Sequence, residues 1–285
     1  MIHARTGRRN GGRRLAVFGL AMVTVLAVCA VFAPWLSPQD PLAIDPLARL
    51  TSPNAEHWFG TDHYGRDTFS RVVHGSRMAA LIGIGVVAIA LGGGIAFGVT
   101  SAVFPRLGLL LMRIVDVLMA FPALLLALAL IVILGRGVEN SILAIGVVYM
   151  TTTARIVYGV SLRLKAETWI DAALAMGAGT SRIVFLHILP NLMSPLFVQA
   201  SFVFAFAQLQ AASLDFLGLG VPPETPTWGN MLSESRVYIT RAPWLLLFPG
   251  LMIALSAFSL NVVGDAVRDR LDPRLQTAFS ARGRS

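Results

Sequence analysis

Six apolar stretches, separated by shorter polar ones, dominate the pattern of the chain. Each is long enough for a helix to cross a bilayer, which takes about 20 residues. Helix is the expected conformation, because backbone groups in lipid must be hydrogen-bonded within their own segment. The pattern therefore predicts an all-α membrane protein with six transmembrane helices. The predicted spans are Leu15–Leu36, Met78–Phe104, Leu107–Leu134, Ser141–Val160, Ser194–Gly220 and Trp244–Val263.

The polar stretches divide the chain into regions. A basic tail precedes the first span, as in a retained signal anchor. A long polar segment follows this span, a second polar segment interrupts the remaining five spans, and a polar tail ends the chain. The predicted regions are the basic tail 1–14, the first helix 15–36, the polar segment 37–77, the five-helix core 78–263 with its polar segment 161–193, and the tail 264–285.

Composition supports the membrane class. Hydrophobic residues make up 55% of the chain and charged residues 13%, with a mean hydropathy of +0.70. Soluble domains carry roughly 25% charged residues. The single cysteine, Cys29, excludes an internal disulfide and a cysteine-based metal cluster. The net charge of +8 does not gather on one domain, so it does not indicate nucleic-acid binding.

The distribution of basic residues predicts the orientation. Cytoplasmic segments of membrane proteins are enriched in lysine and arginine. With the N-terminus in the cytoplasm, 16 of the 23 basic residues lie on the inner side and 7 on the outer side. We therefore expect both termini and the 161–193 segment to be cytoplasmic.

The sequence lacks the motifs of several common classes of catalytic and binding site. A nucleotide-binding P-loop needs a Gly-Lys pair, but the only lysine, Lys165, follows Leu164. H-E-x-x-H and G-x-S-x-G are also absent, so we expect no catalytic residues in this chain. His57, His63 and His74 crowd the 37–77 segment, but their spacing fits no common metal-ligand pattern. We expect a hydrogen-bonded loop there and no metal site.

Few polar residues fall inside the spans. Arg113 and Asp116 are three residues apart in the third span and could pair on one helix face. Gln208 and Asp215 lie in the fifth span. Asp116, Gln208 and Asp215 are therefore candidates for a translocation pathway or outer gate. The alternative, that such side chains hold helices together, stays open.

The polar segment 161–193 contains "DAALAMGAGTSRIVFLHILPN" between Asp171 and Asn191. Gly177 suits the left-handed conformation that ends a helix. Thr180 or Ser181 could cap a second helix, and Pro190 is expected to end it. This helix should present Ile183, Leu186 and Leu189. The pattern fits either a docking element for a soluble partner or an interfacial hairpin, and leaves both open.

This stretch resembles the EAA loop of ABC-importer permeases, with aspartate in place of the first glutamate. The residues that carry the resemblance are Asp171, Ala172, Ala173, Gly177, Ile188, Leu189 and Pro190. Three further stretches, His57–Arg77, Leu214–Gly229 and Gly264–Arg274, are similar to motifs of the dipeptide/oligopeptide/nickel permease family, C-type subunit. Trp58, Phe59 and Asp215 depart from these motifs. The first motif includes Gly60, Thr61, Asp62, Gly65, Arg66 and Asp67.

The resemblance implies a type I ABC importer permease fold, with one N-terminal helix and a five-helix core. It implies a bacterial inner-membrane importer, most commonly for di- or oligopeptides, in which 161–193 couples to ATPases. The implied partners are a second homologous permease, two ATPase subunits that bind ATP and Mg²⁺, and a periplasmic or lipid-anchored binding protein. A nickel, glutathione or other small-solute importer is the alternative on this scaffold. A secondary carrier that works without ATPases is the alternative from another class.

Overall fold

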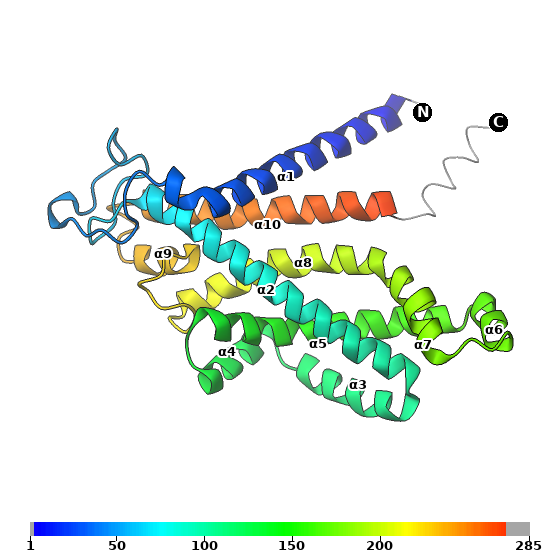
Figure 1. Ribbon diagram of the computed structural model, residues 1–285. Helices are drawn as coiled ribbons and strands as arrows, with labels where there is room; N and C mark the ends of the chain where they lie inside the picture. Colours follow the sequence, from blue (N-terminus) through cyan, green and yellow to red (C-terminus); the bar gives the residue numbers. More distant parts are fainter. Residues whose placement is uncertain (1–2, 272–285) are drawn as a thin grey trace.

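The computed structural model describes the backbone of residues 3–271 and the side chains of residues 15–267. Within that part the chain is helical, without a strand (Figure 1). The end of the predicted Gly264–Arg274 motif lies outside the described residues. The helices are α1 (His3–Leu36), α2 (Thr68–Val103), α3 (Pro105–Met119), α4 (Ala123–Leu134), α5 (Val138–Lys165), α6 (Thr168–Ala175), α7 (Thr180–Arg182), α8 (Leu189–Phe216), α9 (Trp228–Ser235) and α10 (Trp244–Leu271).

Five of the helical segments are long and apolar enough to cross a membrane, and a bent pair of helices raises the number to six. This confirms the all-α membrane class. The first candidate span, Leu15–Leu36, coincides with the predicted one. Helix α2 begins at Thr68, well before the predicted start of the second span. The carboxylate of Asp67 caps α2 by accepting from the backbone N–H of Ser70 at 2.8 Å.

The predicted third span is wrong as one straight helix. It is broken between α3 and α4, whose axes differ by 98°. The break falls at Phe121 and Pro122. Proline has no N–H to donate, and it disfavours helical geometry in the residue before it. The apolar pattern hides this break because the residues on both sides are equally hydrophobic.

The predicted helix end at Pro190 is also wrong. One continuous helical segment runs from Thr180 to Phe216. A π-helical turn, η2 (Ile183–Ile188), precedes the proline, and the N–H of Leu189 donates to the carbonyl of Val184, five residues back. The wider turn makes room for a ring that would clash in a regular α-helix. The N-cap of this segment is Gly179, and neither Thr180 nor Ser181 caps it through its side chain.

Close helix packing builds the bundle. Helix α2 packs along α5, α10 packs on α8, and α1 lies on α2 and α10 (Figure 1). Small residues allow backbones in membrane bundles to approach closely. A Cβ on Gly98 of α2 would lie 2.6 Å from the Cβ of Val157 in α5, so only glycine fits there.

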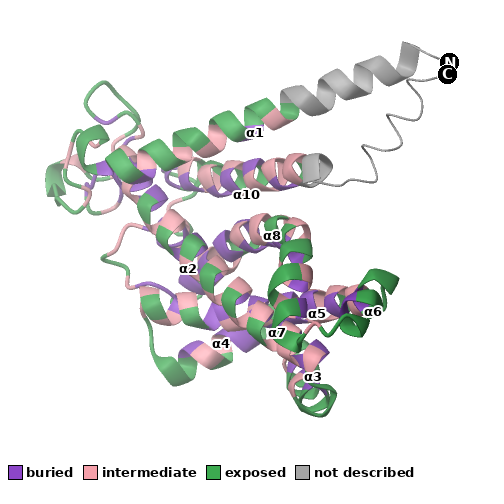
Figure 2. Ribbon diagram, turned by 45° about the vertical axis from the view of Figure 1, so that its right-hand side comes forward, coloured by how far each residue is buried: buried purple, intermediate pink, exposed green. Residues whose placement is uncertain are grey.

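The two ends of the bundle carry different parts of the chain. The start of α1, the end of α10 and helices α6 and α7 lie at one end (Figure 1), and most of α6 is exposed there (Figure 2). The 37–67 segment and α9 lie at the other end (Figure 1). The start of α1 and the end of α10 thus lie on the side that carries the 161–193 segment. Which end faces the cytoplasm stays a prediction.

Candidate functional site

The sequence motif 171–191 folds into a hinge segment, defined here as residues 168–190. Helix α6 ends at Ala175, and Gly177 just beyond it has a φ of +84°, the left-handed conformation that the sequence predicted. The N–H of Gly177 donates to Leu174 O at 2.9 Å, and the N–H of Ala178 donates to Ala173 O at 3.0 Å. These two bonds form a Schellman motif, which satisfies carbonyls at the helix end and reverses the chain.

One face of the hinge segment is anchored in the bundle. Ile170, Ala173, Ile183 and Ile188 are buried, and they pack in one cluster with residues of α5 and α8 such as Val157. Ile183, which the sequence pattern placed on the presented side of its helix, is therefore turned into the bundle instead, as is Ala173. Because the cluster joins both helices, a force applied to α6 is transmitted to α5 and α8.

The opposite face of the hinge segment is apolar and open. Met176 is 83% exposed, and Phe185 and Leu186 are exposed as well. Leu174 and Trp169 are exposed on α6. Among the predicted motif residues, Asp171, Ala172, Gly177 and Pro190 are exposed and Leu189 is half-buried. The sequence reasoning singled out Leu186 but missed the other four apolar side chains, which become recognisable only once the buried face is known.

Asp116 forms an ion pair, but not with the predicted partner. Its carboxylate pairs with the guanidinium of Arg155 on α5, whereas Arg113 lies on its own helix. The Asp116 side chain is 56% exposed and that of Arg155 is 40% exposed. Arg155 lies about 15 Å from the Lys165 end of α5 and about 25 Å from the Val138 end, at 1.5 Å per residue. The pair thus lies within a candidate membrane span, and both of its side chains are partly exposed.

The other two pathway candidates are buried and hydrogen-bonded. Gln208 donates its side-chain N–H to the carbonyl of Ala79 at 2.8 Å, which joins α8 to α2. Asp215 accepts from the N–H of Val221 at 2.8 Å and from the hydroxyl of Thr227 at 2.7 Å. Thr227 in turn caps α9. Gln208 and Asp215 therefore brace helices and a loop in this structure, and their place in a pathway stays a prediction.

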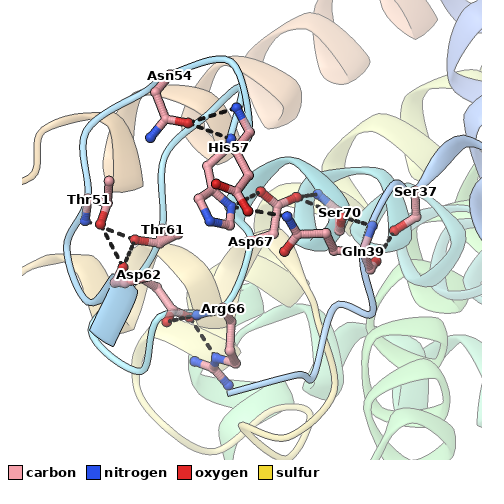
Figure 3. A network of polar contacts seen from close by, with 12 residues as sticks. Ser37, Gln39, Thr51, Asn54, His57, Thr61, Asp62, Arg66, Asp67 and Ser70 are labelled. Atoms are coloured by element: carbon pink, nitrogen blue, oxygen red, sulfur yellow. Dashed lines mark hydrogen bonds and ion pairs between the residues drawn. The ribbon is translucent and has the colours of Figure 1, made fainter. Parts of the chain in front are cut away.

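The motif at residues 57–67 forms a network of polar contacts (Figure 3). Asp62 accepts from the backbone N–H of Arg66 at 3.0 Å and from its Nε at 2.6 Å. Arg66 also reaches Glu234 of α9 at 2.8 Å. The hydroxyl of Thr61 donates to the carbonyl of Ala48. Asp67 caps α2 and lies 3.1 Å from His57 Nδ1.

The two glycines of this motif fit only as glycines. Gly60 and Gly65 have φ values of +70° and +80°. A Cβ on Gly65 would overlap the carbonyl of Asp45, and one on Gly60 would lie 2.6 Å from Thr51 O. The motif side chains Thr61, Asp62, Arg66 and Asp67 are buried. Their contacts within the chain favour a role in bracing the fold.

Asp62, His63 and Glu234 place their ligand atoms within 4.8 Å of one another. Arg66 and Arg71 face the same two carboxylates, and Arg71 Nη2 lies 3.4 Å from Glu234. A cation would have to displace these guanidinium groups, so the geometry describes an ion-pair cluster. Burial lowers the pKa of His63, against the opposing effect of Asp62 and Glu234.

Comparison with known proteins defines the class. Residues 94–277 match the family described as the binding-protein-dependent transport system inner membrane component. Residues 8–53 match the N-terminal transmembrane domain of oligopeptide transport permease C. The chain therefore belongs to the permeases of binding-protein-dependent ABC importers. It is a multi-pass membrane component of such an importer and not its ATPase.

Individual relatives place the chain within its C-type branch. It is 43% identical to the dipeptide transport system permease protein DppC of Alkalihalophilus pseudofirmus, over 93% of this chain and 87% of the relative. It is 38% identical to the glutathione transport system permease protein GsiD of Escherichia coli, over 94% and 89%. The fold is similar to a chain of the inward-facing MetNI methionine ABC transporter. The TM-score is 0.54 at 21% identity, over 69% of this chain and 96% of the other.

Proposed function

We propose that the chain is one of two homologous permease subunits of an ATP-driven importer for di- and oligopeptides in a bacterial inner membrane. The substrate rests on relatives named for dipeptide and di/tripeptide transport, each 43% identical over more than nine tenths of this chain. Two ATPase subunits and a periplasmic or lipid-anchored binding protein complete the complex. Both termini are cytoplasmic, as the charge distribution predicts.

The observation that carries this proposal is the hinge segment. It combines an anchored face with an open apolar face, at the bundle end where α1 begins and α10 ends. A groove on an ATPase subunit would cover the exposed Met176, Phe185 and Leu186. ATP and Mg²⁺ are bound by those subunits, because this chain has no phosphate-binding loop. Closure of the ATPases would push the hinge segments together and tilt the bundle between two states.

The Asp116–Arg155 pair supports a pathway on the α3–α5 side. Charged side chains inside a membrane face a protein interior or a water-filled cavity, because contact with lipid tails is costly. The open side of the pair therefore faces the second permease across the translocation pathway. In this proposal, Gln208 and Asp215 brace the bundle, because their side chains are buried within the chain.

Uptake by the assembled complex tests the proposal. The tagged chain is purified with its bound subunits, reconstituted in liposomes, and supplied with MgATP and the binding protein. Labelled dipeptide should accumulate only when ATP and the binding protein are both present. Uptake of only glutathione or Ni²⁺ would establish the alternative substrates. Uptake by this chain alone without ATP would establish a secondary carrier instead.

A further inference from the structure

An apolar cavity of about 200 Å³ lies between membrane-spanning helices of the chain. Helices α1, α2, α8 and α10 contribute its walls, and Trp228 of α9 contributes one more side chain. Representative lining residues are Val23, Ala80, Phe204 and Leu260. The cavity is larger than the apolar cavity of about 150 Å³ that admits benzene in an engineered protein. It separates part of the N-terminal helix from the five-helix core.

The polar groups in the cavity wall are engaged elsewhere. Each of its two hydroxyls, its glutamine amide and its indole N–H donates a hydrogen bond to a backbone carbonyl. A buried water molecule needs two to four polar partners, so these walls favour an apolar occupant. The donors are Ser76, Gln208, Trp228 and Ser256, and the acceptors are the carbonyls of Val73, Ala79, Val72 and Ile253 respectively.

The cavity is continuous with the surface that meets the bilayer. Ile84 of α2 lines the cavity, yet it is 63% exposed. Ala27 of α1 also lines it and is exposed. Leu20 and Leu81 are exposed on the same two helices. Since α1 and α2 are candidate membrane spans, acyl chains would cover the surface at this mouth when the helices cross a bilayer.

We propose that this cavity binds one acyl chain of a membrane phospholipid between the N-terminal helix and the core. From Ser76 to Ile84 the cavity wall extends about 12 Å along α2, at 1.5 Å per residue, which suits part of one chain. The headgroup remains outside in the interfacial layer. The site requires only that these helices span a bilayer, so it is independent of the transported substrate.

Trp228 supplies a reporter for this site. It lines the cavity and is only 4% exposed. Replacing Trp35, Trp58, Trp169 and Trp244 by phenylalanine leaves Trp228 as the single tryptophan of the full chain. This variant is reconstituted in phospholipid brominated near the middle of its acyl chains, since bromine quenches tryptophan fluorescence on contact. We expect Trp228 to lose at least half of its fluorescence relative to unbrominated lipid.

Filling the cavity distinguishes the site from general contact with lipid. The double substitution Ala27→Leu with Ala80→Leu should restore most of the Trp228 fluorescence. Ala21→Leu is the matched control, because Ala21 is exposed on α1 and does not line the cavity. It should leave the quenching unchanged. Circular dichroism checks that each variant remains helical.

Native mass spectrometry gives a second measurement that does not depend on the double variant, which could fold poorly. The purified chain should retain one phospholipid that the single variant Ala80→Leu loses and Ala21→Leu keeps. The proposal is overturned if Trp228 is not quenched, or if filling the cavity leaves its quenching intact. It is also overturned if assembly with the second permease abolishes the quenching, because a partner helix would then occupy the site.

Discussion

Gly177 and Gly179 differ in backbone conformation, but both have room for a side chain. No atom lies within 4 Å of a Cβ built on either residue, and φ is +84° at Gly177 but −72° at Gly179. Gly177→Val should therefore cost about 1 kcal/mol or more in the local turn. We expect it to leave the spans inserted and to reduce transport sharply. Uptake and ATPase activity of the reconstituted complex measure the effect.

Gly179→Val is the matched control for that substitution. Valine readily adopts the extended conformation found at Gly179, so this variant should transport nearly as the wild type does. Equal transport by both valine variants, at full expression, would mean that the hinge segment is only an interfacial hairpin.

His63 should make the 37–67 segment sensitive to acid. Burial lowers its pKa, so the folded loop holds the neutral ring while the unfolded chain takes up a proton. The stabilisation is complete above the unfolded pKa of about 6.5 and is lost as the pH falls through the folded value. The melting temperature of the wild type should fall more between neutral pH and pH 5 than that of His63→Gln. An equal fall in both proteins would refute this assignment.

The role of a single residue was predictable where it depends only on the local backbone conformation. The positive φ of Gly177 follows from its position at a helix end. The partner of Asp116 could not be predicted, because Arg155 lies on a helix distant in sequence. From the sequence alone, Gln208 and Asp215 could not be distinguished from Asp116 as pathway candidates. Only the packing of α2 and the 221–227 loop against them revealed their bracing contacts.

At the scale of elements, the contact between α3 and α5 carries a testable charge pair. Asp116→Arg should leave two cations facing each other inside the membrane and lower transport at least tenfold. The exchange of both charges, Asp116→Arg with Arg155→Asp, should recover part of the loss if their mutual attraction matters. Transport and complex assembly are measured together. Full transport by Asp116→Arg would remove the pair from the pathway.

The open face of the hinge segment should govern ATPase binding. Met176→Glu places a charge where we propose an apolar groove, so the affinity for the ATPases should fall at least tenfold. Val237→Glu is the control, because Val237 is 75% exposed and directly follows α9, which lies at the other end of the bundle. Co-purification of the ATPase subunits with each variant checks the prediction. Equal co-purification would place the ATPase contact elsewhere.

The effect of a proline on a helix could not be predicted from the sequence pattern alone. Pro122 breaks a uniformly apolar stretch, whereas Pro190 lies within a continuous helical segment. Neither proline has a backbone N–H group to donate. The difference depends on whether the preceding turn widens, as Ile183–Ile188 does. The sequence contains no signal for that widening. The apolar pattern therefore predicted a continuous span in the first case, and the proline predicted a helix end in the second.

For the whole molecule, the topology has a direct test. After Cys29→Ser removes the only native thiol, Glu56→Cys and Glu167→Cys place single cysteines at exposed sites on opposite ends of the bundle. An impermeant thiol reagent added outside should label position 56 and spare position 167. Permeabilised cells supply the control, in which both positions should react. Labelling of position 167 in intact cells would reverse the orientation.

The class of the fold was predictable from the sequence because long apolar stretches leave the chain little choice but to span the membrane as helices. The arrangement of those helices was harder to predict from the sequence. Spans such as α2 are apolar on most sides, so their pattern does not identify the face that meets α5. Close contacts such as Gly98 against Val157 decide it, and these require both helices to be known.

The continuous segment Thr180–Phe216 has a mechanical consequence. Its 37 residues run from the hinge segment to the other end of the bundle without a break in the helix, although the segment bends where η2 meets α8 (Figures 1 and 2). The bond from Gln208 to Ala79 fastens the segment to α2 near its Phe216 end. A movement of the hinge segment would therefore reach the far end of the bundle through one continuous helix, without crossing a flexible loop.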